Sequence, residues 1–545
     1  MGRMDLRARI RSLLPACGVL CMGALLCGGS IGAQSRVSKL PGSRRSAAEA
    51  QPAQRSDVVR FSRRVDTALA ATGPDKGFWG VLVTDADTGE VLYSRNAGNF
   101  FLPASDAKLF TTALALATLG PAYRVRTTVT ATDTLDANGV LSGDLLLNGR
   151  GDANLSNRKF PYDKKVERDG ASDKALAALA DAVVARGVKE IDGNVIADDS
   201  LFPQERFPSG WTVDDMLWSY GAAVSAIAVN DNTFTLELRP GSLAGDPATY
   251  AVDPASDFYT IENLIVTGPH GSEEKLAASR EPGSRLVRVS GAMPAGAPPR
   301  RLTIAIEEPA EYAATLLARL LQARGVQIRG VARARHFGDP SLASSDHPAE
   351  TVLAERVGEP LAEEVRHVNK NSLNLHAELL LLLAAHEKSG VVSREDAVKF
   401  AADSYRSFGI ADGDMVLSDG SGLSRRDLVT PRAIVKLLNY AATQSWGEVY
   451  RSSLPVAGVD GTLSERMKNT AAEGHIAAKT GTVEHVVALS GYATTAHGAH
   501  LTFSILGNNN SLHAQSADAV LDSIAVAMVE ELGAAPAGKR NKLRK

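Results

Sequence analysis

Apolar residues recur every three to four positions in several stretches of the chain, a pattern that predicts helices. These stretches are 58–70, 109–119, 174–185, 313–323, 377–385, 394–408 and 514–532. The second of them follows Pro103 and Ala104. Because proline is tolerated in a first helical turn, we expect that helix to begin near Pro103. Thr430-Pro431 is expected to open a further helix.

Other stretches alternate apolar and polar residues between clusters of Gly, Asp and Pro, which is typical of strands. Segments 79–85 and 90–94 flank Ala86-Asp-Thr-Gly89 and predict a β-hairpin. Further strands are expected at 125–131, 141–147, 476–482, 486–492 and 501–506. Residues 239–301 are rich in Gly, Pro and Ser with short alternating runs, so they are expected to form a small all-β segment.

A short internal similarity joins two of the predicted helices. Ala-Arg-Gly-Val ends the helix at 185–188 and recurs at 323–326, and Ile-x-Gly follows at 191–193 and at 328–330. This favours two copies of a helix–strand unit within one α+β module, with coincidence as the competing explanation for so short a match.

Composition narrows the possible functions. The chain of 545 residues is long enough for two or three domains, and its net charge of -3 gives no basic field for nucleic acid. Its three cysteines, Cys17, Cys21 and Cys27, all lie near the N-terminus. If that segment is removed, the mature protein has no thiol, which excludes a cysteine nucleophile or a Cys-zinc site. No later stretch is long and apolar enough to span a bilayer.

The first residues have the pattern of a secretory signal peptide. Four arginines between 3 and 11 precede an apolar run at 13–26, and Ile31-Gly-Ala33 offers a cleavage site. A lipoprotein anchor at Cys17 or Cys27 and an uncleaved membrane anchor are the alternatives. We therefore expect export to the periplasm or another extracytoplasmic part of the cell envelope. At the other end, five basic residues from Lys539 onward form either a solvated tail or a weak contact with anionic lipid or wall polymer.

The strongest candidate chemistry is the tetrad Ser105-Asp-Ala-Lys108 at the start of the predicted helix. Residues three apart share one helix face, so the Lys108 ammonium can reach the Ser105 hydroxyl. A lysine in a dry site loses its charge near neutral pH and can act as the base that a serine nucleophile needs. Alone, such a tetrad is common on helix surfaces.

Two further triplets support that interpretation. Ser372-Leu-Asn374 precedes an apolar helix, and Lys479-Thr-Gly481 lies on a predicted strand. Separately, Ser372 could be a helix cap and Lys479 a solvated lysine. The order of the three motifs is that of the S-x-x-K, S-D-N and K-T-G set of penicillin-interacting serine enzymes. His367, His376 and His475 lie near the motifs without a ligand cluster, so we interpret them as structural or surface residues.

With these motifs the chain resembles the class C low-molecular-mass penicillin-binding proteins, the D-alanyl-D-alanine carboxypeptidase/endopeptidases of serine peptidase family S13. The resemblance extends over the whole mature chain and includes four further segments: 198–202, 220–226 with Asn230 and Asn232, 419–425 and 460–463. The long insertion between Ser105 and Ser372 also matches this family, because class A β-lactamases have only a short segment there.

The resemblance implies a multidomain α+β fold. A penicillin-binding-protein/β-lactamase-like transpeptidase domain, an antiparallel sheet flanked by helices, is interrupted by a nested two-domain insertion. The expected boundaries are 1–33 for the signal peptide, 34–55 for a linker, 56–123 and 349–535 for the serine peptidase domain, 124–238 and 302–348 for an α+β inserted domain, 239–301 for a small β-rich nested domain and 536–545 for the basic tail.

The family implies hydrolysis of the D-Ala-D-Ala bond of peptidoglycan stem peptides, and of D-Ala-to-diamino-acid crosslinks, through an acyl-enzyme on Ser105. Lys108 would take the serine proton, Ser372 and Lys479 would pass a proton to the leaving amine, and Asn374 would orient Lys108 and the substrate amide. The backbones of Ser105 and Thr482 would hold the oxyanion. The terminal carboxylate would be bound by Lys479, Thr480 and Thr482, with Gly481 in the same triplet.

Contacts with the stem-peptide side chain would come from Asp198, Phe202, Arg425 and Glu484. Glu484 departs from the neutral residue expected in the family, and Asp198 could equally be a turn residue. No metal or organic cofactor is implied, and β-lactam antibiotics are expected as covalent inhibitors. Two alternatives remain: a serine β-lactamase or esterase of the same superfamily, and a non-catalytic cell-wall-binding scaffold.

Overall fold

The computed structural model describes residues 55–71, 73–343 and 351–533. These residues all belong to one compact unit of the chain, Gln51–Lys545. The expected signal peptide, the linker up to residue 54 and the basic tail lie outside them. The α-helices of this part are α1 (Ser56–Leu69), α2 (Ala107–Leu119), α3 (Lys174–Ala185), α4 (Pro309–Gln322), α5 (Leu361–Asn371), α6 (Asn374–Ser389), α7 (Arg394–Ser407), α8 (Pro431–Ala442), α9 (Gly447–Ser453) and α10 (Ala514–Glu531). Each predicted helix is therefore confirmed, with small shifts at the ends.

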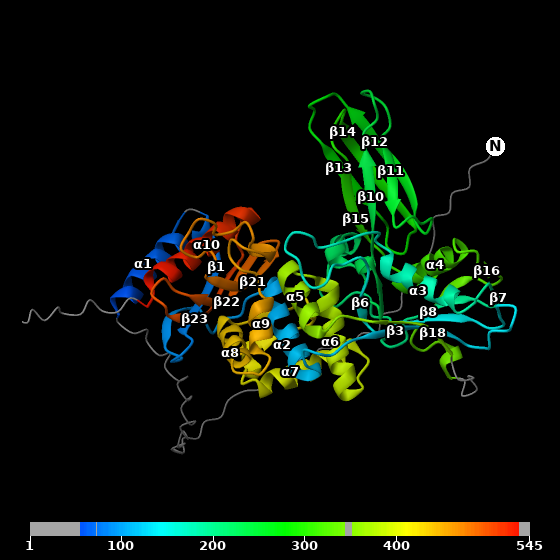
Figure 1. Cartoon of the computed structure of the whole chain (residues 1–545). Coiled ribbons are helices and arrows are strands. Elements are labelled where there is room, and N and C mark those ends of the chain that lie inside the picture. Colours follow the sequence, from blue (N-terminus) through cyan, green and yellow to red (C-terminus); the bar gives the residue numbers. More distant parts are fainter. Residues whose placement is uncertain (1–54, 72, 344–350, 534–545) are drawn as a thin grey trace, which may run out of the picture. The chain divides into compact units, whose positions relative to one another are not determined.

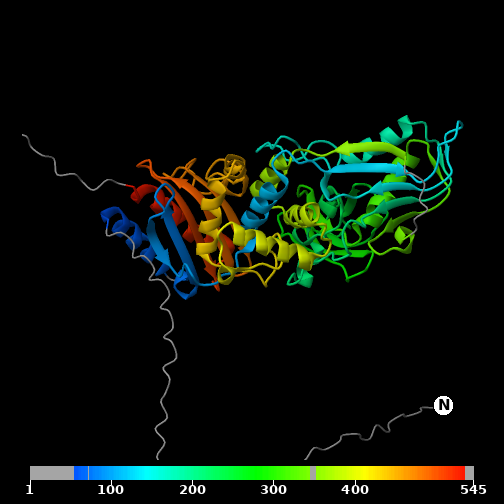
Figure 2. The same cartoon turned by 90° about the horizontal axis from the view of Figure 1, so that it is seen from below.

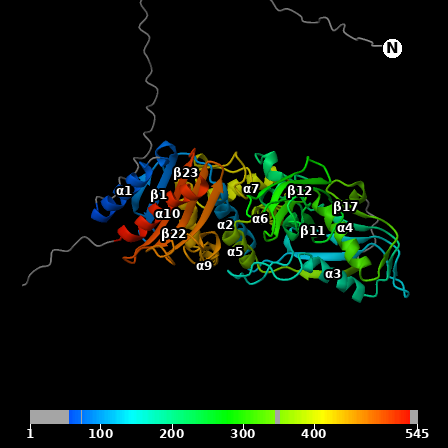
Figure 3. The same ribbon diagram turned by 90° about the horizontal axis from the view of Figure 1, so that it is seen from above.

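A five-stranded antiparallel sheet joins the two ends of the described chain, in the order β2-β1-β23-β22-β21. Its strands are β1 (Phe78–Asp85), β2 (Val91–Arg95), β21 (Ile476–Val483), β22 (Val486–Thr494) and β23 (His500–Asn508). The predicted hairpin is β1–β2. Helices α1 and α10 lie side by side on this sheet, and their apolar faces share a core with it (Figures 1 and 3).

A second core lies among α2, α5, α6, α7, α8 and α9. Every residue of α2 from Ala107 to Leu116 is buried, because α5, α6, α7 and α8 surround it. These later helices, yellow in Figure 2, lie between the strands of the first sheet and the inserted segment. Helices α2 and α6, which follow the first two motifs, are thus packed directly against each other.

The inserted segment contains a mixed sheet in the order β17-β8-β5-β3-β18. Its strands are β3 (Arg126–Ala131), β5 (Leu145–Asn148), β8 (Val195–Asp198), β17 (Ala332–Arg335) and β18 (Thr351–Val357). Helices α3 and α4 share a core with this sheet. The chain enters through β3 and leaves through β18, which pair antiparallel, so the two ends of the insertion lie side by side.

The internal similarity seen in the sequence is a stacked structural repeat. Strand β16 (Gln327–Ile328) pairs in parallel with β7 (Glu190–Ile191), and β7 pairs in parallel with β4 (Val140–Leu141), a third copy that the sequence comparison missed. The backbone and side-chain amides of Asn194 donate to the Asp144 carboxylate, and the side-chain oxygen Oδ1 of Asn194 accepts from the Val331 backbone amide.

The stretch predicted to be all-β, 239–301, contributes to two three-stranded sheets, which begin before it with β10 and end after it with β15. One is β11 (Thr249–Asp253), β10 (Thr233–Arg239) and β15 (Arg300–Ala305); the other is β12 (Thr260–Gly268), β14 (Leu286–Pro294) and β13 (Lys275–Ser279). The remaining strands form two short pairs, β6 (Asp152–Leu155) with β9 (Ile227–Val229) and β19 (Met415–Val416) with β20 (Leu428–Val429). The exact domain boundaries stay a prediction.

Candidate active site

Ser105 lies in a 3₁₀ turn, Ala104–Asp106, that leads directly into α2. The Lys108 ammonium nitrogen Nζ is fully buried and lies 2.9 Å from Ser105 Oγ, 2.5 Å from Asn374 Oδ1 and 2.6 Å from the Ser421 carbonyl oxygen. A neutral amine has two N–H groups and one lone pair. If Lys108 donates to the two carbonyl-type oxygens, its lone pair is left for the proton of Ser105.

The surroundings of Lys108 favour that neutral form. Burial lowers the pKa of Lys108 well below its ordinary value, and the nearby Lys479 ammonium lowers it further. The carboxyl groups of Asp419, Glu378 and Asp106 oppose this shift without overcoming it. Lys108 therefore meets both requirements of a general base, contact with the hydroxyl and a depressed pKa.

The second motif is at the junction of α5 and α6. Ser372 ends α5 in the left-handed region, with φ 59°, and Asn374 begins α6. This reversal directs both side chains toward the other two motifs: Ser372 Oγ lies 2.9 Å from Lys479 Nζ, and the Asn374 amide bridges Lys108 and the Tyr220 carbonyl oxygen.

The K-T-G triplet lies on β21, one of the two edge strands of the first sheet. Lys479 is fully buried, and its Nζ also donates to the Thr480 carbonyl at 2.7 Å. Burial lowers the pKa of Lys479 to about 8, opposed by the Asp106 carboxyl. Gly481 is required for close approach to the nucleophile turn, because a Cβ there would lie 2.7 Å from the Pro103 carbonyl oxygen and 3.0 Å from the Ser105 nitrogen.

Asp106, next to the nucleophile, is a buried carboxyl that sequence reasoning overlooked. Its turn packs on β21 and β22, where Lys479, Ser490 and Ser504 are cross-strand neighbours on one face. Burial raises the pKa of Asp106, although Ser490 and the two lysines favour its ionised form. The carboxyl thus lies close enough to influence the charge of both lysines.

Of the remaining predicted site residues, some lie near the three motifs and others lie away from them. Thr480 is close to the motifs, with its hydroxyl 2.7 Å from that of Thr462, and Thr482 is exposed on the same strand. Arg425 is partly buried and near enough to Tyr220 to influence its pKa. Glu484 lies beyond the end of β21 with its side chain 78% exposed.

Asp198 and Phe202 have interior contacts instead. Asp198 ends β8, forms a buried ion pair with Arg335 and accepts from the Ser200 amide. Phe202 is buried in the helical core, edge-on to His386. The structure does not bring these two side chains together with the three motifs through any described contact, and their role in substrate binding stays a prediction.

Besides Asp106, three further groups at the site were not assigned a role from the sequence. The Ser421 carbonyl that holds Lys108 belongs to a loop organised by Asp419, whose carboxylate accepts from the amides of Ser421, Gly422 and Ser424. Thr462 contacts the K-T-G strand, and Tyr220 lies against Asn374. All three lie in segments that support the family resemblance, which was the available signal.

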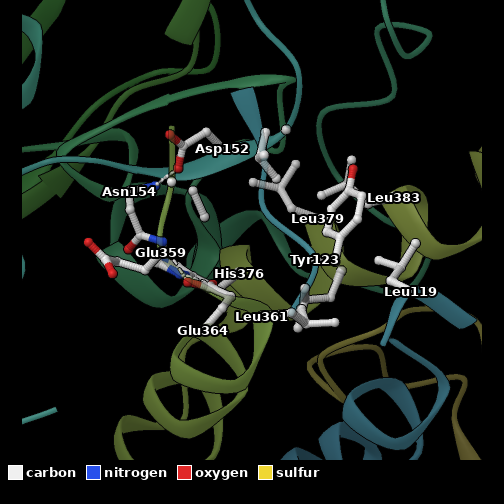
Figure 4. A pocket seen from close by; sticks show the side chains of 15 residues that line it. Leu119, Tyr123, Asp152, Asn154, Glu359, Leu361, Glu364, His376, Leu379 and Leu383 are labelled. Carbon is white, nitrogen blue, oxygen red and sulfur yellow. Dashed lines mark hydrogen bonds and ion pairs between the residues drawn. The ribbon is translucent and has the colours of Figure 1, made fainter. Parts of the chain in front are cut away.

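His376 is buried between two carboxylates. Its Nδ1 lies 2.7 Å from Glu364 of α5, and its Nε2 lies 3.1 Å from Asp231 of the inserted segment. Figure 4 shows His376, Glu364 and Asn154 together at the polar end of a pocket whose other wall contains Leu379 and Leu383. This confirms the structural interpretation of His376; His367 is likewise buried, and His475 is exposed.

Within the described ranges, no group of three or more His, Cys, Asp or Glu side chains could hold a metal ion. The same part of the chain has no helix long and apolar enough to cross a membrane.

The family model and the known proteins with similar sequences all point to D-alanyl-D-alanine carboxypeptidases. The model of the D-Ala-D-Ala carboxypeptidase 3 (S13) family matches residues 62–529. A D-alanyl-D-alanine carboxypeptidase of Actinomadura sp. (strain R39) is 35% identical over 495 residues, which cover 89% of this chain and 87% of the relative. The D-alanyl-D-alanine carboxypeptidase DacB of Haemophilus influenzae is 24% identical and covers 79% of this chain and 85% of its own.

Among solved structures, penicillin-binding protein 4 from Haemophilus influenzae superposes with a TM-score of 0.72 at 23% identity, covering 86% of this chain and 98% of the other. The predicted multidomain α+β fold of the penicillin-binding-protein type is confirmed.

Proposed function

We propose, from the premise that this chain belongs to the D-Ala-D-Ala carboxypeptidase 3 (S13) family, that it hydrolyses the D-Ala-D-Ala bond of peptidoglycan stem peptides through an acyl-enzyme on Ser105. It is a serine-type hydrolase of the D-Ala-D-Ala carboxypeptidase kind. The observation that carries the proposal is the position of Lys108, buried and in contact with Ser105, Asn374 and the Ser421 carbonyl.

Acylation begins when neutral Lys108 takes the Ser105 proton as Oγ attacks the carbonyl carbon of the scissile bond. The backbone amides of Ser105 and Thr482 stabilise the oxyanion of the tetrahedral intermediate. The C–N bond then breaks, and the departing amine receives a proton from the Ser372 hydroxyl. Lys479 in turn donates a proton to Ser372. The 2.9 Å contact between Ser372 Oγ and Lys479 Nζ supports this transfer.

The substrate's terminal carboxylate is bound by the cationic form of Lys479 with the hydroxyls of Thr480 and Thr482. Water then attacks the acyl-enzyme carbonyl, and the proton that it loses returns through Ser372 to Lys479. As the ester bond breaks, Lys108 returns its proton to Ser105 Oγ and the shortened peptide leaves. A β-lactam acylates the same serine, but its opened ring stays attached and hinders that water, so the adduct persists.

The wider assignments rest on the charge and hydropathy pattern of the two ends of the sequence and, for the domain scheme, on the family resemblance. We infer export by the 1–33 segment to the periplasm or an equivalent compartment, and a peptidase domain of 56–123 and 349–535 interrupted by domains at 124–238 with 302–348 and at 239–301. The basic residues from Lys539 onward provide at most a salt-sensitive peripheral contact with membrane or wall.

Labelling with fluorescent penicillin tests the assignment of nucleophile and base. Wild type forms a stable covalent adduct, Ser105→Ala forms none, and Lys108→Ala is acylated more slowly by roughly 10²–10⁴-fold, the usual contribution of a general base. Lys399→Ala is the matched control, because that side chain is 63% exposed on α7. Near-normal acylation of either active-site variant contradicts the proposed roles.

A further inference from the structure

Asp106, the residue directly after the nucleophile, is a fully buried carboxyl to which the proposed reaction gives no role. Neither of its carboxyl oxygens has a hydrogen-bond partner among the described residues. A buried charge is costly unless other charges or hydrogen bonds compensate it, and a buried polar atom without a partner is uncommon in folded proteins. Asp106 therefore calls for an explanation in the groups that face it.

The turn that carries Asp106 packs on one face of β21 and β22. On that face Lys479 is opposite Ser490 and Ser490 is opposite Ser504, with 2.9 Å between the two serine hydroxyls. All three side chains are fully buried. Neighbouring residues such as Leu489 point to the other face, into the core shared with α1 and α10. The sheet therefore presents a lysine and two hydroxyls to the turn of Asp106, rather than apolar side chains.

Titratable groups face this carboxyl from three elements. Lys479 comes from β21, Lys108 from α2 and Tyr450 from α9. The Tyr450 hydroxyl donates to the Leu109 carbonyl oxygen at 3.0 Å, and burial raises its pKa well above the ordinary value, so this group stays neutral. The two lysines are therefore the groups whose charge Asp106 can change.

The two lysines depend on Asp106 to different degrees. Lys479 donates to two uncharged oxygens, and Asp106 is the carboxyl that opposes the effect of burial on its pKa. Around Lys108, the carboxyls of Asp419 and Glu378 act in that direction more strongly than Asp106 does. After burial, the Lys479 ammonium is the largest cause of the low pKa of Lys108. A carboxylate that keeps Lys479 cationic therefore also favours the neutral form of Lys108.

The proposed reaction needs opposite protonation states in these two buried lysines. Lys108 must be neutral to accept the Ser105 proton, whereas Lys479 must be cationic to bind the substrate's terminal carboxylate. We propose that Asp106 is a positioning residue that separates the two states, because its carboxylate keeps the proton on Lys479. The inference rests on the proposed function and adds to it a residue that sets the pH range of substrate binding.

The test is the pH dependence of hydrolysis of a soluble tripeptide that ends in D-Ala-D-Ala, with kcat and KM measured from pH 5.5 to 9.5. In wild type, kcat/KM falls as the pH rises through about 8, where Lys479 loses its proton. Asp106→Asn keeps the shape of the side chain without its charge, so burial acts on Lys479 unopposed and the fall begins at lower pH. At pH 9 we expect kcat/KM roughly tenfold below wild type, mainly through a higher KM, which is the effect of lowering one pKa by about one unit.

The comparison at low pH separates this role from a structural one. Burial raises the pKa of Asp106 to about 7, so at pH 6 the wild-type carboxyl is itself mostly uncharged and the two proteins should converge. A variant that only distorts the turn loses activity at every pH. Asp106→Thr removes the charge with a different side chain and should reproduce the shift, also where Asp106→Asn does not fold. Asp403→Asn is the control, because this carboxylate is 66% exposed on α7, and its profile should match wild type.

Three results overturn the inference: a wild-type pH profile in the folded variants without the charge, a loss of kcat/KM that is equal at pH 6 and pH 9, or failure of both variants to fold, which would make the carboxyl structural. Each of these leaves the proposed function intact. A wild type that neither hydrolyses the tripeptide nor is labelled by penicillin refutes that function itself.

Discussion

At the scale of single residues, the site depends on backbone conformations that side chains rarely adopt. Ala104, just before the nucleophile, has φ 47°, and Ser372 has φ 59°. Such conformations cost about 1–3 kcal/mol each, so neighbouring contacts must hold them. The turn at Ala104 is held between the K-T-G strand on one side and Gly422 on the other, where an added Cβ would lie 1.8 Å from the Ala104 carbonyl oxygen. Nucleophile and base are therefore placed by backbone packing as much as by side chains.

Gly481→Ala tests this placement. The added methyl would meet the Pro103 carbonyl and the Ser105 amide, which are backbone atoms that cannot rotate away. The strand is pushed from the nucleophile, and a misplacement of about 1 Å can cost on the order of 10²-fold in rate. We expect penicillin acylation to slow by about that factor. Gly413→Ala, where nothing lies within 4 Å, should acylate normally. Equal rates for the two variants would show that close approach at 481 is not needed.

At the scale of elements, a buried ionic bridge connects α5 and α6 to the inserted segment. Against the effect of burial, Glu364 and Asp231 raise the pKa of His376 to about 9, and His376 and Asn154 help to lower that of Glu364 to about 2. Asp231 also accepts from Arg158 and Arg168, each at 2.6 Å. Because His376 is only two residues after Asn374, this bridge fixes the start of α6 and thereby the S-x-N motif.

The bridge predicts a specific pH dependence of stability. A histidine whose pKa is raised on folding stabilises fully below its unfolded pKa near 6.5, and this contribution is lost as the pH rises through about 9. A shift of this size corresponds to about 3 kcal/mol. The difference in unfolding free energy between wild type and His376→Asn should therefore shrink by roughly that amount between pH 6 and pH 10, measured by urea denaturation.

His475→Asn is the control for that measurement, since this histidine is exposed. Its difference from wild type should stay small at both pH values. A His376→Asn difference that is the same at pH 6 and pH 10 would mean that the imidazole is neutral in the fold and that no ionic bridge exists.

At the scale of the whole molecule, the inserted segment completes the active site. The Tyr220 carbonyl accepts from Asn374, and the buried Trp211 donates to Asp419, the carboxylate that organises the loop holding Lys108. Both contacts join residues of the insertion to residues beyond it in the sequence. The peptidase domain thus depends on contacts from the inserted segment for the geometry of its active site.

Trp211→Phe should weaken the reaction without a change at any motif. The phenyl ring keeps most of the packing but removes the 2.8 Å hydrogen bond to Asp419. Losing one bond to a buried carboxylate costs about 1–3 kcal/mol, so we expect acylation to slow about tenfold and the melting temperature to fall by a few degrees. Trp446→Phe, a buried tryptophan whose indole donates to no described residue, should acylate like wild type. If acylation slows more in Trp446→Phe than in Trp211→Phe, the bond between Trp211 and Asp419 is not needed for the reaction.

The sequence by itself determined the features that depend on local order. Helical periodicity located α1 to α4, α6 to α8 and α10, and Ala-Asp-Thr-Gly marked the β1–β2 hairpin. The spacing of Ser105 and Lys108 predicted their contact, because a turn of helix fixes which side chains are neighbours. The order of three short motifs indicated a penicillin-interacting serine enzyme, and four further segments with the long insertion between Ser105 and Ser372 indicated the family.

Only the tertiary structure decided what depends on distant segments. The depressed pKa of Lys108 comes from burial and from Lys479, hundreds of positions away. The burial of Asp198 and Phe202, the third copy of the stacked strand repeat and the bridge at His376 also result from contacts between remote residues. Solvent exclusion and electrostatic interaction act through space, and the distances that govern them are set by packing of the whole fold rather than by neighbours along the chain.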